Sequence, residues 1–252
     1  MFKFIIFFSI YIFLNTNLYN LGFSNINASF GFGEVYKTGY LDIKAMVESY
    51  SDYLKAQKLL IEETFDYSKV EFLDNGLKYN AIEAKHIFFC EGFGLHANPY
   101  FNDLPLDGTK GELLIIKAPE LQLQAIVKSN IFILPIGNDR YKVGATYNWE
   151  DKTNLPTANG KKELLQNLEE LIACDYEVVA HFAGVRPTVK DRRPLVGTHY
   201  VHKQLHILNG LGTRGVMLGP FLAKQLFEYL ENESALDKEI DINRFYKKRG
   251  LL

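Results

Sequence analysis

A glycine-rich turn between an apolar strand and a helix constrains this chain more than any other feature of its sequence. Residues 205–209 are typical of a short strand, and Gly210-Leu-Gly-Thr-Arg-Gly215 follows with the spacing Gly-x-Gly-x-x-Gly. Glycines at this spacing let the backbone approach a ligand closely and aim the N–H groups of the next helix at negative charge. Apolar residues at helical spacing predict that this helix runs from Val216 to Glu231.

The same spacing occurs in nicotinamide-binding βαβ units, which need a second buried strand after the helix, ending in an acidic residue that holds a ribose. A βαβ unit takes roughly 30 residues or more. Here only a charged tail follows the helix, and its one extended-looking piece is Ile240-Asp-Ile242. An NAD-binding dehydrogenase is therefore the less favoured alternative. We expect the glycine loop to complete a site to which other segments contribute.

Other segments form a succession with this loop. They are Thr38-Gly-Tyr-Leu-Asp42 before a helix, the strand and glycine turn of residues 87–94, Lys110-Gly-Glu-Leu-Leu114 opening a strand, Gly184-Val-Arg-Pro187, and Asp191-Arg-Arg-Pro-Leu-Val-Gly197. In this order, from about Gly33 to Tyr229, the chain resembles the FAD-dependent amine and amino-acid oxidases related to D-amino acid oxidase, glycine oxidase and sarcosine oxidase. The resemblance implies oxidation of a small amine or amino acid, with transfer of a hydride to the flavin.

The resemblance also implies an α/β fold of mixed α+β character, in which an incomplete FAD-binding α/β domain is interleaved with an antiparallel-sheet substrate domain. Residues 29–104 and 181–252 would form the remnant of the FAD-binding domain. Residues 105–180 would form the substrate-side sheet, and residues 1–28 would be an apolar segment outside the family domain.

Two groups of site residues follow from the resemblance. Arg186 would hold the substrate carboxylate in a two-pronged pair, which the planar guanidinium suits better than lysine does; the alternative is an arginine that pairs with a nearby acid. Gly92, Phe93 and Gly94 would approach the diphosphate or ribityl chain of FAD, with Glu91 in place of the small residue usual in the family. The residues expected against the flavin ring are Gly210, Leu211, Gly212, Thr213, Arg214 and Gly215.

The helix that begins near Val216 would stabilise negative charge on the pyrimidine end of the flavin, an effect of about 0.3–1 kcal/mol, or about 2 kcal/mol when sheltered. The alternative is a purely structural strand-to-helix turn, because glycine turns are common. The resemblance names FAD as the cofactor, and no metal site is expected, because the six histidines lack a zinc-site motif.

The N-terminal region lacks the first Gly-x-Gly-x-x-Gly of the family, since Gly31-Phe-Gly-Glu-Val-Tyr36 has tyrosine at the third glycine position. The opening apolar run, Met1 to Leu14, is shorter than the about 20 residues that span a membrane. It resembles the apolar core of a secretory signal but has no clear cleavage site. We interpret it as the product of a start assigned inside a longer or frameshifted gene, and expect a truncated and inactive form.

Composition predicts a globular remainder with a small-molecule substrate. Of 252 residues, 47% are hydrophobic and 23% are charged, enough for a sizeable core. A net charge of −2 gives no general attraction to nucleic acid or to an anionic membrane, so neither partner is expected. Cys90 and Cys174 are expected to be buried thiols, which is compatible with a reducing compartment. The expected location is cytoplasmic, with export as the alternative if residues 1–28 act as a signal peptide. The sequence does not determine the oligomeric state.

Local patterns predict individual elements and environments. Helices are expected over residues 42–57 and 161–173, and hairpins over 70–79 and 131–145, turning at Asp74-Asn-Gly76 and Gly137-Asn-Asp139. We expect His181 to lie in the core and His199 and His202 to lie in a surface loop. Tyr147 and Trp149 are expected to pack on the sheet. A solvated loop is expected to carry Lys190, Arg192 and Arg193.

The other alternative function is that of a non-catalytic scaffold or interaction protein derived from the oxidoreductase.

Overall fold

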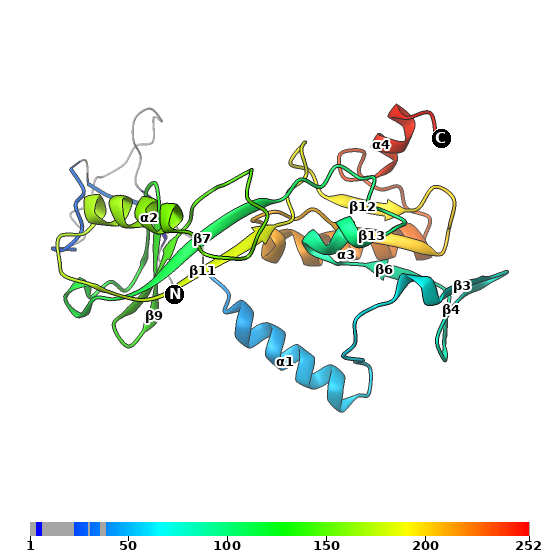
Figure 1. The fold of residues 1–252 in the computed structure, drawn as a ribbon, viewed down its shortest axis with the longest axis horizontal. Helices are drawn as coiled ribbons and strands as arrows, with labels where there is room; N and C mark the ends of the chain where they lie inside the picture. The colour runs from blue at the N-terminus through cyan, green and yellow to red at the C-terminus, as the bar shows by residue number, and fades with distance from the viewer. Residues whose placement is uncertain (1–3, 7–22, 30, 36–38, 252) are drawn as a thin grey trace. The chain divides into compact units, whose positions relative to one another are not determined.

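The computed structural model describes residues 4–6, 23–29, 31–35 and 39–251 (Figure 1). The chain divides into two compact units, each made of two separate stretches of sequence. Unit 1 comprises residues 1–42 and 110–185, and unit 2 comprises residues 43–109 and 186–252. The mixed α/β fold with interleaved parts that the sequence predicts is therefore confirmed. The assignment of a cofactor role to one part and a substrate role to the other stays a prediction.

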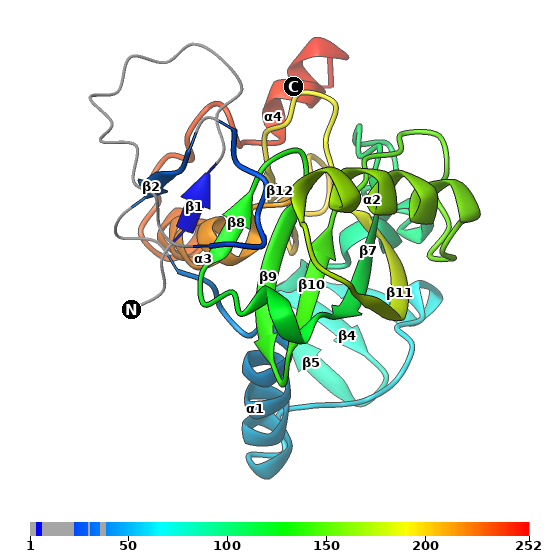
Figure 2. The same ribbon diagram turned by 90° about the vertical axis from the view of Figure 1, so that its left-hand side faces the viewer.

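Unit 1 contains a seven-stranded sheet in the order β11-β7-β10-β9-β8-β1-β2. The strands are β11 (Glu177–Arg186), β7 (Thr109–Lys117), β10 (Arg140–Gly144), β9 (Phe132–Gly137), β8 (Ile126–Lys128), β1 (Phe4–Ile6) and β2 (Gly33–Val35). The pairs from β7 to β8 are antiparallel, whereas β1 runs parallel to β8 and antiparallel to β2. Figure 2 shows these strands side by side with helix α2 (Ala158–Leu171) lying across them.

Helix α2 packs on the sheet through an apolar stripe. Leu164 and Leu168 are completely buried and share a core with Leu114 and Ile116, which alternate along β7. The helix begins three residues before the predicted residue 161 because Thr157 caps it, its side-chain oxygen accepting the N–H of Gly160 at 3.0 Å.

Both predicted hairpins are confirmed. Strands β3 (Val70–Leu73) and β4 (Gly76–Tyr79) pair antiparallel with only Asp74 and Asn75 between them, and β5 (Ile82–Ala84) extends this sheet. Between β9 and β10, Asn138 and Asp139 have φ of 53° and 55°. Two consecutive left-handed residues suit the right-handed twist of the flanking strands, and asparagine and aspartate tolerate that conformation.

Unit 2 contains a three-stranded mixed sheet that carries the glycine loop. Its order is β12 (Leu195–Thr198), β13 (Leu205–Asn209) and β6 (Ile87–Phe89), with β13 antiparallel to β12 and parallel to β6. Helix α3 (Gly215–Glu231) follows the loop, as predicted (Figure 1). Its Leu222 and Leu226 share a buried cluster with Val196 of β12.

The chain after α3 returns to this sheet beside β12. The N–H of Val196 donates to the carbonyl of Ile240, and the N–H of Ile242 donates to the carbonyl of Val196, both at 3.0 Å. This segment runs parallel to β12 and hence antiparallel to β13. The strand, helix and tail therefore do not form a parallel βαβ unit, which agrees with the prediction against a nicotinamide fingerprint.

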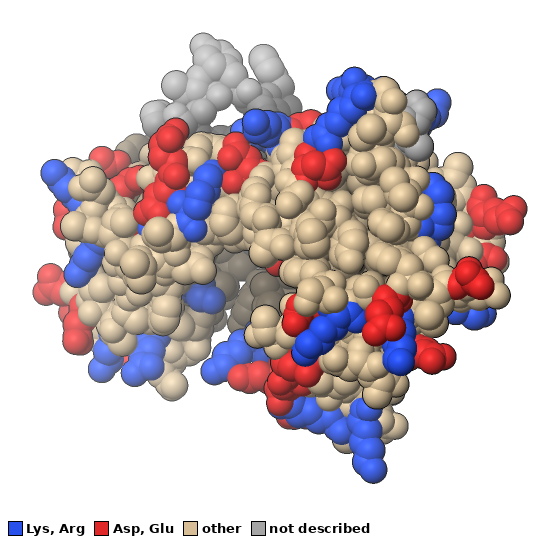
Figure 3. All heavy atoms as spheres, turned by 45° about the vertical axis from the view of Figure 1, so that its right-hand side comes forward, with Lys and Arg blue, Asp and Glu red and all other residues tan. Residues whose placement is uncertain are grey.

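Helix α1 (Ile43–Ala56) confirms the helix predicted over residues 42–57, but it has no buried residue. The other helical segments are η1 (Tyr67–Lys69), η2 (Gly92–Ala97), η3 (Pro119–Leu121) and α4 (Asn243–Lys248). Within the described ranges, no helix combines the length and apolar character needed to cross a membrane. Acidic and basic side chains are interspersed over the face shown in Figure 3.

Candidate functional site

The two glycine loops singled out in the sequence follow neighbouring parallel strands of unit 2. Gly92-Phe93-Gly94 comes just after β6, and Gly210–Gly215 follows β13 directly. Because β6 and β13 pair in parallel, their carboxyl ends meet at one edge of the sheet. Ligands of open α/β sheets bind beyond the carboxyl ends of the strands. The structure thus brings together the segments expected to contact a cofactor.

Asn209, the last residue of β13, joins the two loops. Its side-chain Nδ2 donates to the carbonyl of Gly92 at 2.9 Å, and its Oδ1 accepts the N–H of Gly210 at 2.7 Å. The residue as a whole is 3% exposed. Sequence analysis missed this residue, although a polar residue that ends an apolar strand immediately before a glycine is the signal that could have identified it.

Glu91, which stands where the family has a small residue, is accommodated by partners within unit 2. The hydroxyl of Tyr67 donates to its Oε1, and Asn98 Nδ2 donates to its Oε2 at 2.8 Å. Burial, and then the hydrogen bond to Glu91, raise the pKa of the Tyr67 hydroxyl above its ordinary value. Both carboxylate oxygens therefore have hydrogen-bond donors at the start of the first loop.

Arg186 lies at the end of β11, directly before a segment that contacts the second loop. The N–H of Gly212 donates to the carbonyl of Pro187 at 3.0 Å, and Thr188 forms an isolated antiparallel β-bridge with Leu211. The backbone that carries the partly buried Arg186 is thus held beside the glycine loop. The two predicted parts of the site, the arginine and the loop, adjoin within unit 2.

The glycines of the two loops differ in what a side chain would meet. At Gly210, which has φ of +71°, an added Cβ would lie 2.4 Å from Val189 Cγ2, so packing requires glycine there. At Gly92 an added Cβ would meet nothing within 4 Å, and at Gly94 only Glu91 Cβ at 3.6 Å. The backbone at Gly92 and Gly94 therefore leaves open space for a ligand to approach closely.

The start of α3 has features that suit such a ligand. No side chain caps this end of the helix, and no acidic residue lies in its first turn. The first N–H groups of a helix point outward and, with the helix dipole, favour an anion. Thr213, Arg214 and Val216 are exposed at this end. Open glycine backbone and an uncapped helix end are what a phosphate-bearing or reduced, anionic cofactor requires.

This contrast between the glycines gives a prediction. Gly210→Ala is expected to lower the free energy of unfolding by about 2–3 kcal/mol, because the methyl group overlaps Val189 and φ is unfavourable. Gly94→Ala should change stability by less than about 1 kcal/mol, since its methyl group meets only an ordinary contact. Urea denaturation of both variants measures the difference. Equal destabilisation by the two substitutions would contradict this interpretation.

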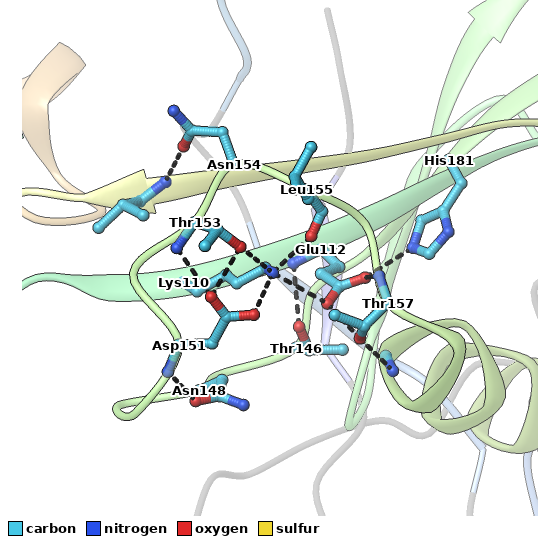
Figure 4. Close-up of polar contacts among 12 residues, drawn as sticks. Lys110, Glu112, Thr146, Asn148, Asp151, Thr153, Asn154, Leu155, Thr157 and His181 are labelled. Carbon is cyan, nitrogen blue, oxygen red and sulfur yellow. Dashed lines mark hydrogen bonds and ion pairs between the residues drawn. The ribbon is translucent and has the colours of Figure 1, made fainter.

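A buried polar cluster in unit 1, which sequence analysis also missed, involves Lys110 and Glu112 of β7 (Figure 4). Lys110 is fully buried; its Nζ donates to Asp151 Oδ2 and the carbonyl of Leu155, both at 2.5 Å, and to Thr153 Oγ1 at 3.2 Å. These bonds tie the connection before α2 to β7. The hydrogen bond from Lys110 lowers the pKa of Asp151 to about 2.

Glu112 joins three elements of unit 1. It accepts the N–H of Thr157 at 2.9 Å and the hydroxyl of Thr157 at 2.7 Å, at the residue that caps α2. His181 Nε2 of β11 lies 2.8 Å from Glu112 Oε2, an ion-pair distance without the alignment of a hydrogen bond. His181 is partly buried beside Glu112 rather than completely enclosed. The cluster joins β7, β11 and the start of α2 within unit 1.

The structure corrects three environments expected from the sequence. His199 is 6% exposed instead of lying on the surface, because its Nδ1 accepts the N–H groups of Val201 and His202 and holds the loop inward. Tyr147 and Trp149 are 63% and 40% exposed rather than packed on the sheet, since they follow the end of β10. Cys90 is exposed, not buried, and Cys174 is partly exposed. The solvated loop at Lys190, Arg192 and Arg193 is confirmed.

Two glycine loops at the carboxyl ends of neighbouring parallel strands, within a chain that also carries a mostly antiparallel sheet, are typical of proteins that bind a nucleotide cofactor. The sequence model of the family described as "FAD dependent oxidoreductase" matches residues 33–229. This chain belongs to that family, whose cofactor is FAD. The resemblance found in the sequence is thereby confirmed.

Relatives and solved structures agree with this family. The chain is 22% identical over 236 residues to glycine oxidase of Bacillus subtilis strain 168, covering 87% of this chain and 63% of that protein. The crystal structure of glycine oxidase from Geobacillus kaustophilus is similar with a TM-score of 0.57 at 26% identity, covering 69% of this chain and 50% of that chain. The chain therefore spans less than two thirds of the length of these relatives.

Proposed function

We propose that this chain serves FAD-dependent oxidation of a small amine or amino acid, and that unit 2 supplies its cofactor contacts. The observation that carries the proposal is the meeting of both glycine loops at the carboxyl edge of β6 and β13, where Asn209 bonds to both. The names of the relatives, which include glycine oxidases, support a small amine as the substrate class.

The proposed location is cytoplasmic. The two cysteines, Cys90 and Cys174, are free thiols, which suits a reducing compartment.

Each segment has a distinct role in this proposal. Gly92, Phe93 and Gly94 approach the diphosphate or ribityl chain of FAD through open backbone. Gly210–Gly215 lies against the ring, and the start of α3, with Val216, faces the negative charge that develops there. Bound FAD would accept the hydride from the substrate. The protein then has to orient the substrate and favour the charged, reduced ring, which accords with the absence of an obvious acid–base pair in the sequence.

Arg186 is proposed to bind the substrate carboxylate, and the expected cost of removing it is large. Arg186→Ala should weaken amino-acid binding by about 2–5 kcal/mol, because a carboxylate loses a bidentate partner. Arg186→Lys should recover only part of this, since a lysine lacks the planar fork. Perturbation of the flavin absorption spectrum on adding amino acids measures binding without turnover. Arg192→Ala, on the exposed loop, is the control, and an equal effect there would refute the role of Arg186.

The affinity for FAD of the 252 residues alone is proposed to be low, with little or no turnover. A micromolar dissociation constant corresponds to about 8 kcal/mol, whereas a helix N-terminus contributes at most about 2 kcal/mol. The sequence holds one Gly-x-Gly-x-x-Gly, that of Gly210–Gly215, so a second diphosphate-binding turn of this kind is lacking in these residues.

Titration of the purified chain with FAD, followed by quenching of flavin fluorescence and with NAD as the comparison, tests the proposal. Saturable binding of FAD but not NAD is the expected result, and a screen of amines and amino acids would follow. Gly94→Ala, which leaves the fold unstrained, should weaken FAD binding. Saturation by NAD alone, or by neither cofactor at millimolar concentration, would overturn the proposal.

A second candidate function, a non-catalytic interaction protein of the same fold, is favoured by one observation. Helix α1 exposes a stripe of large apolar side chains, namely Ile43, Met46, Val47, Tyr50 and Tyr53, each at least 45% exposed. Exposed apolar patches mark interaction surfaces. A stable, cofactor-free oligomer in light scattering, dissociated by Val47→Asp, would support this candidate, whereas a monomer that binds FAD would exclude it.

A further inference from the structure

We propose that Asn209 is a positioning residue that couples the two glycine loops, so that neither takes its FAD-binding conformation without the other. The inference rests on the proposed function of these loops in binding FAD. It adds a residue for which neither the sequence nor the family resemblance suggested a role. Asn209 and Gly92 are separated by 117 residues in the sequence, and their hydrogen bond joins the loops directly.

The chemistry of the two bonds explains why asparagine is required. The Gly92 carbonyl can only accept, and the Gly210 N–H can only donate. One planar side chain must therefore offer a donor on one side and an acceptor on the other, as a carboxamide does. An aspartate would place a carboxylate oxygen against the Gly92 carbonyl, and a leucine of similar size would satisfy neither group. The leucine leaves both backbone groups without their partner, and the aspartate keeps the bond to the buried Gly210 N–H but loses the bond to the partly buried Gly92 carbonyl, and each loss is costly.

The position of these bonds in the loops explains why they matter for a ligand. Gly92 and Gly210 both have left-handed backbone, with φ of +57° and +71°, so each is the residue at which its loop turns. A glycine in an open turn has many accessible conformations unless a bond holds it. On the other side of the first loop, Asn98 Nδ2 donates to Oε2 of Glu91, the residue before Gly92, at 2.8 Å. With Asn209 in place, the loop is anchored on both sides before a ligand arrives, which reduces the entropy lost on binding.

The first experiment compares FAD dissociation constants of the wild-type chain, Asn209→Leu and Asn209→Asp, all confirmed as folded by circular dichroism. Asn209→Leu loses both hydrogen bonds, and Asn209→Asp loses the bond to the Gly92 carbonyl and sets a carboxylate against it. Both variants are therefore expected to weaken FAD binding by about tenfold to a hundredfold. Asn102→Asp, at an exposed asparagine of the same unit, is the matched control and should bind like wild type.

Repeating the titration from pH 8 to pH 5.5 separates positioning from simple destabilisation. A protonated aspartic acid has one donor and one acceptor oxygen, as asparagine does, so Asn209→Asp should regain affinity relative to wild type as pH falls. Asn209→Leu should show no such recovery. Glu91, the titratable group nearest the Gly92 turn, is present in all the proteins, as is its partner Tyr67, and their effect cancels in the ratio to wild type at each pH.

Hydrogen exchange of the cofactor-free proteins supplies a readout that does not need FAD. Asn209→Leu should speed exchange of amides in both loops, 92–97 and 210–215, and leave β7 in unit 1 unchanged. If wild type binds no FAD, the proposed function fails, yet faster exchange in both loops would still establish the coupling. Unchanged exchange in the first loop, or an Asn209→Asp variant that binds FAD as wild type does at pH 8, would overturn the inference.

Discussion

Glu112→Leu is expected to lower the free energy of unfolding by about 3–5 kcal/mol, the range for breaking a buried ion pair from one side. Glu112 is 3% exposed and lies 3.9 Å from the buried amino group of Lys110. Its removal also leaves the N–H and hydroxyl of Thr157 without their acceptor at the start of α2. The substitution therefore affects a buried charge and a helix cap together.

Urea denaturation followed by circular dichroism measures this effect. Glu163→Leu, at an exposed position on α2, is the matched control and should change stability by less than about 0.5 kcal/mol. The double variant Lys110→Met, Glu112→Leu should be less destabilised than the sum of the two single variants, because the two side chains belong to one buried ion-pair network. A loss below about 1 kcal/mol for Glu112→Leu would show that the cluster is not a stabilising element.

Unit 2 is expected to lose stability as the pH falls from about 6.5 to about 4, because two buried histidines stay neutral in the folded protein. Burial, and then the neighbouring His202, lower the pKa of His199 from 6.5 to about 4. Burial, and then His86, lower the pKa of His206 from 6.5 to about 4. His206 hydrogen-bonds through one ring nitrogen to His86 and through the other to Thr198, both at 2.9 Å.

The sign follows from proton linkage. Between the two pKa values the unfolded chain binds protons that the folded chain excludes, so stability falls with falling pH by up to about 1.4 kcal/mol per pH unit for each histidine. Well above pH 6.5 the two histidines add no pH dependence to the free energy of unfolding. Well below pH 4 their destabilising effect has reached its full size. Denaturation midpoints at pH 7.5, 6 and 5 measure the slope. His199→Gln and His206→Gln should each reduce it, whereas the exposed His96→Gln should not; identical slopes in all four proteins would contradict the prediction.

Elements whose signal lies within a few consecutive residues were predictable from the sequence. The hairpin turn at Asn138 and Asp139 has residues that tolerate left-handed backbone, and the stripe containing Leu164 and Leu168 repeats with the helical period. The strand, glycine turn and helix around Gly210 follow from the same local rules. The order of such segments along the chain was enough to identify the family, because each motif has its own spacing.

Environments that depend on distant partners were not predictable. Lys110 and Glu112 continue the face of β7 that carries Leu114 and Ile116, so alternation alone suggests apolar residues at positions that hold a buried ion pair. The hydrogen-bond partners of these two side chains come from residues 151–157, about 40 residues later in the chain. The exposed α1 shows the converse, since an apolar stripe predicts a helix but not what covers it.

The sequence by itself determined the local structures and the family: where strands turn, which stretches are helical, and which glycines precede α3. Only the tertiary structure decided that β6 and β13 are parallel neighbours, that the loops of Gly92 and Gly210 meet, and that Asn209 joins them across 117 residues. The physical reason is the distance along the sequence over which each kind of interaction acts. Backbone conformation and periodicity act between adjacent residues, whereas burial, strand pairing and a hydrogen bond between distant loops depend on which surfaces the folded chain brings together.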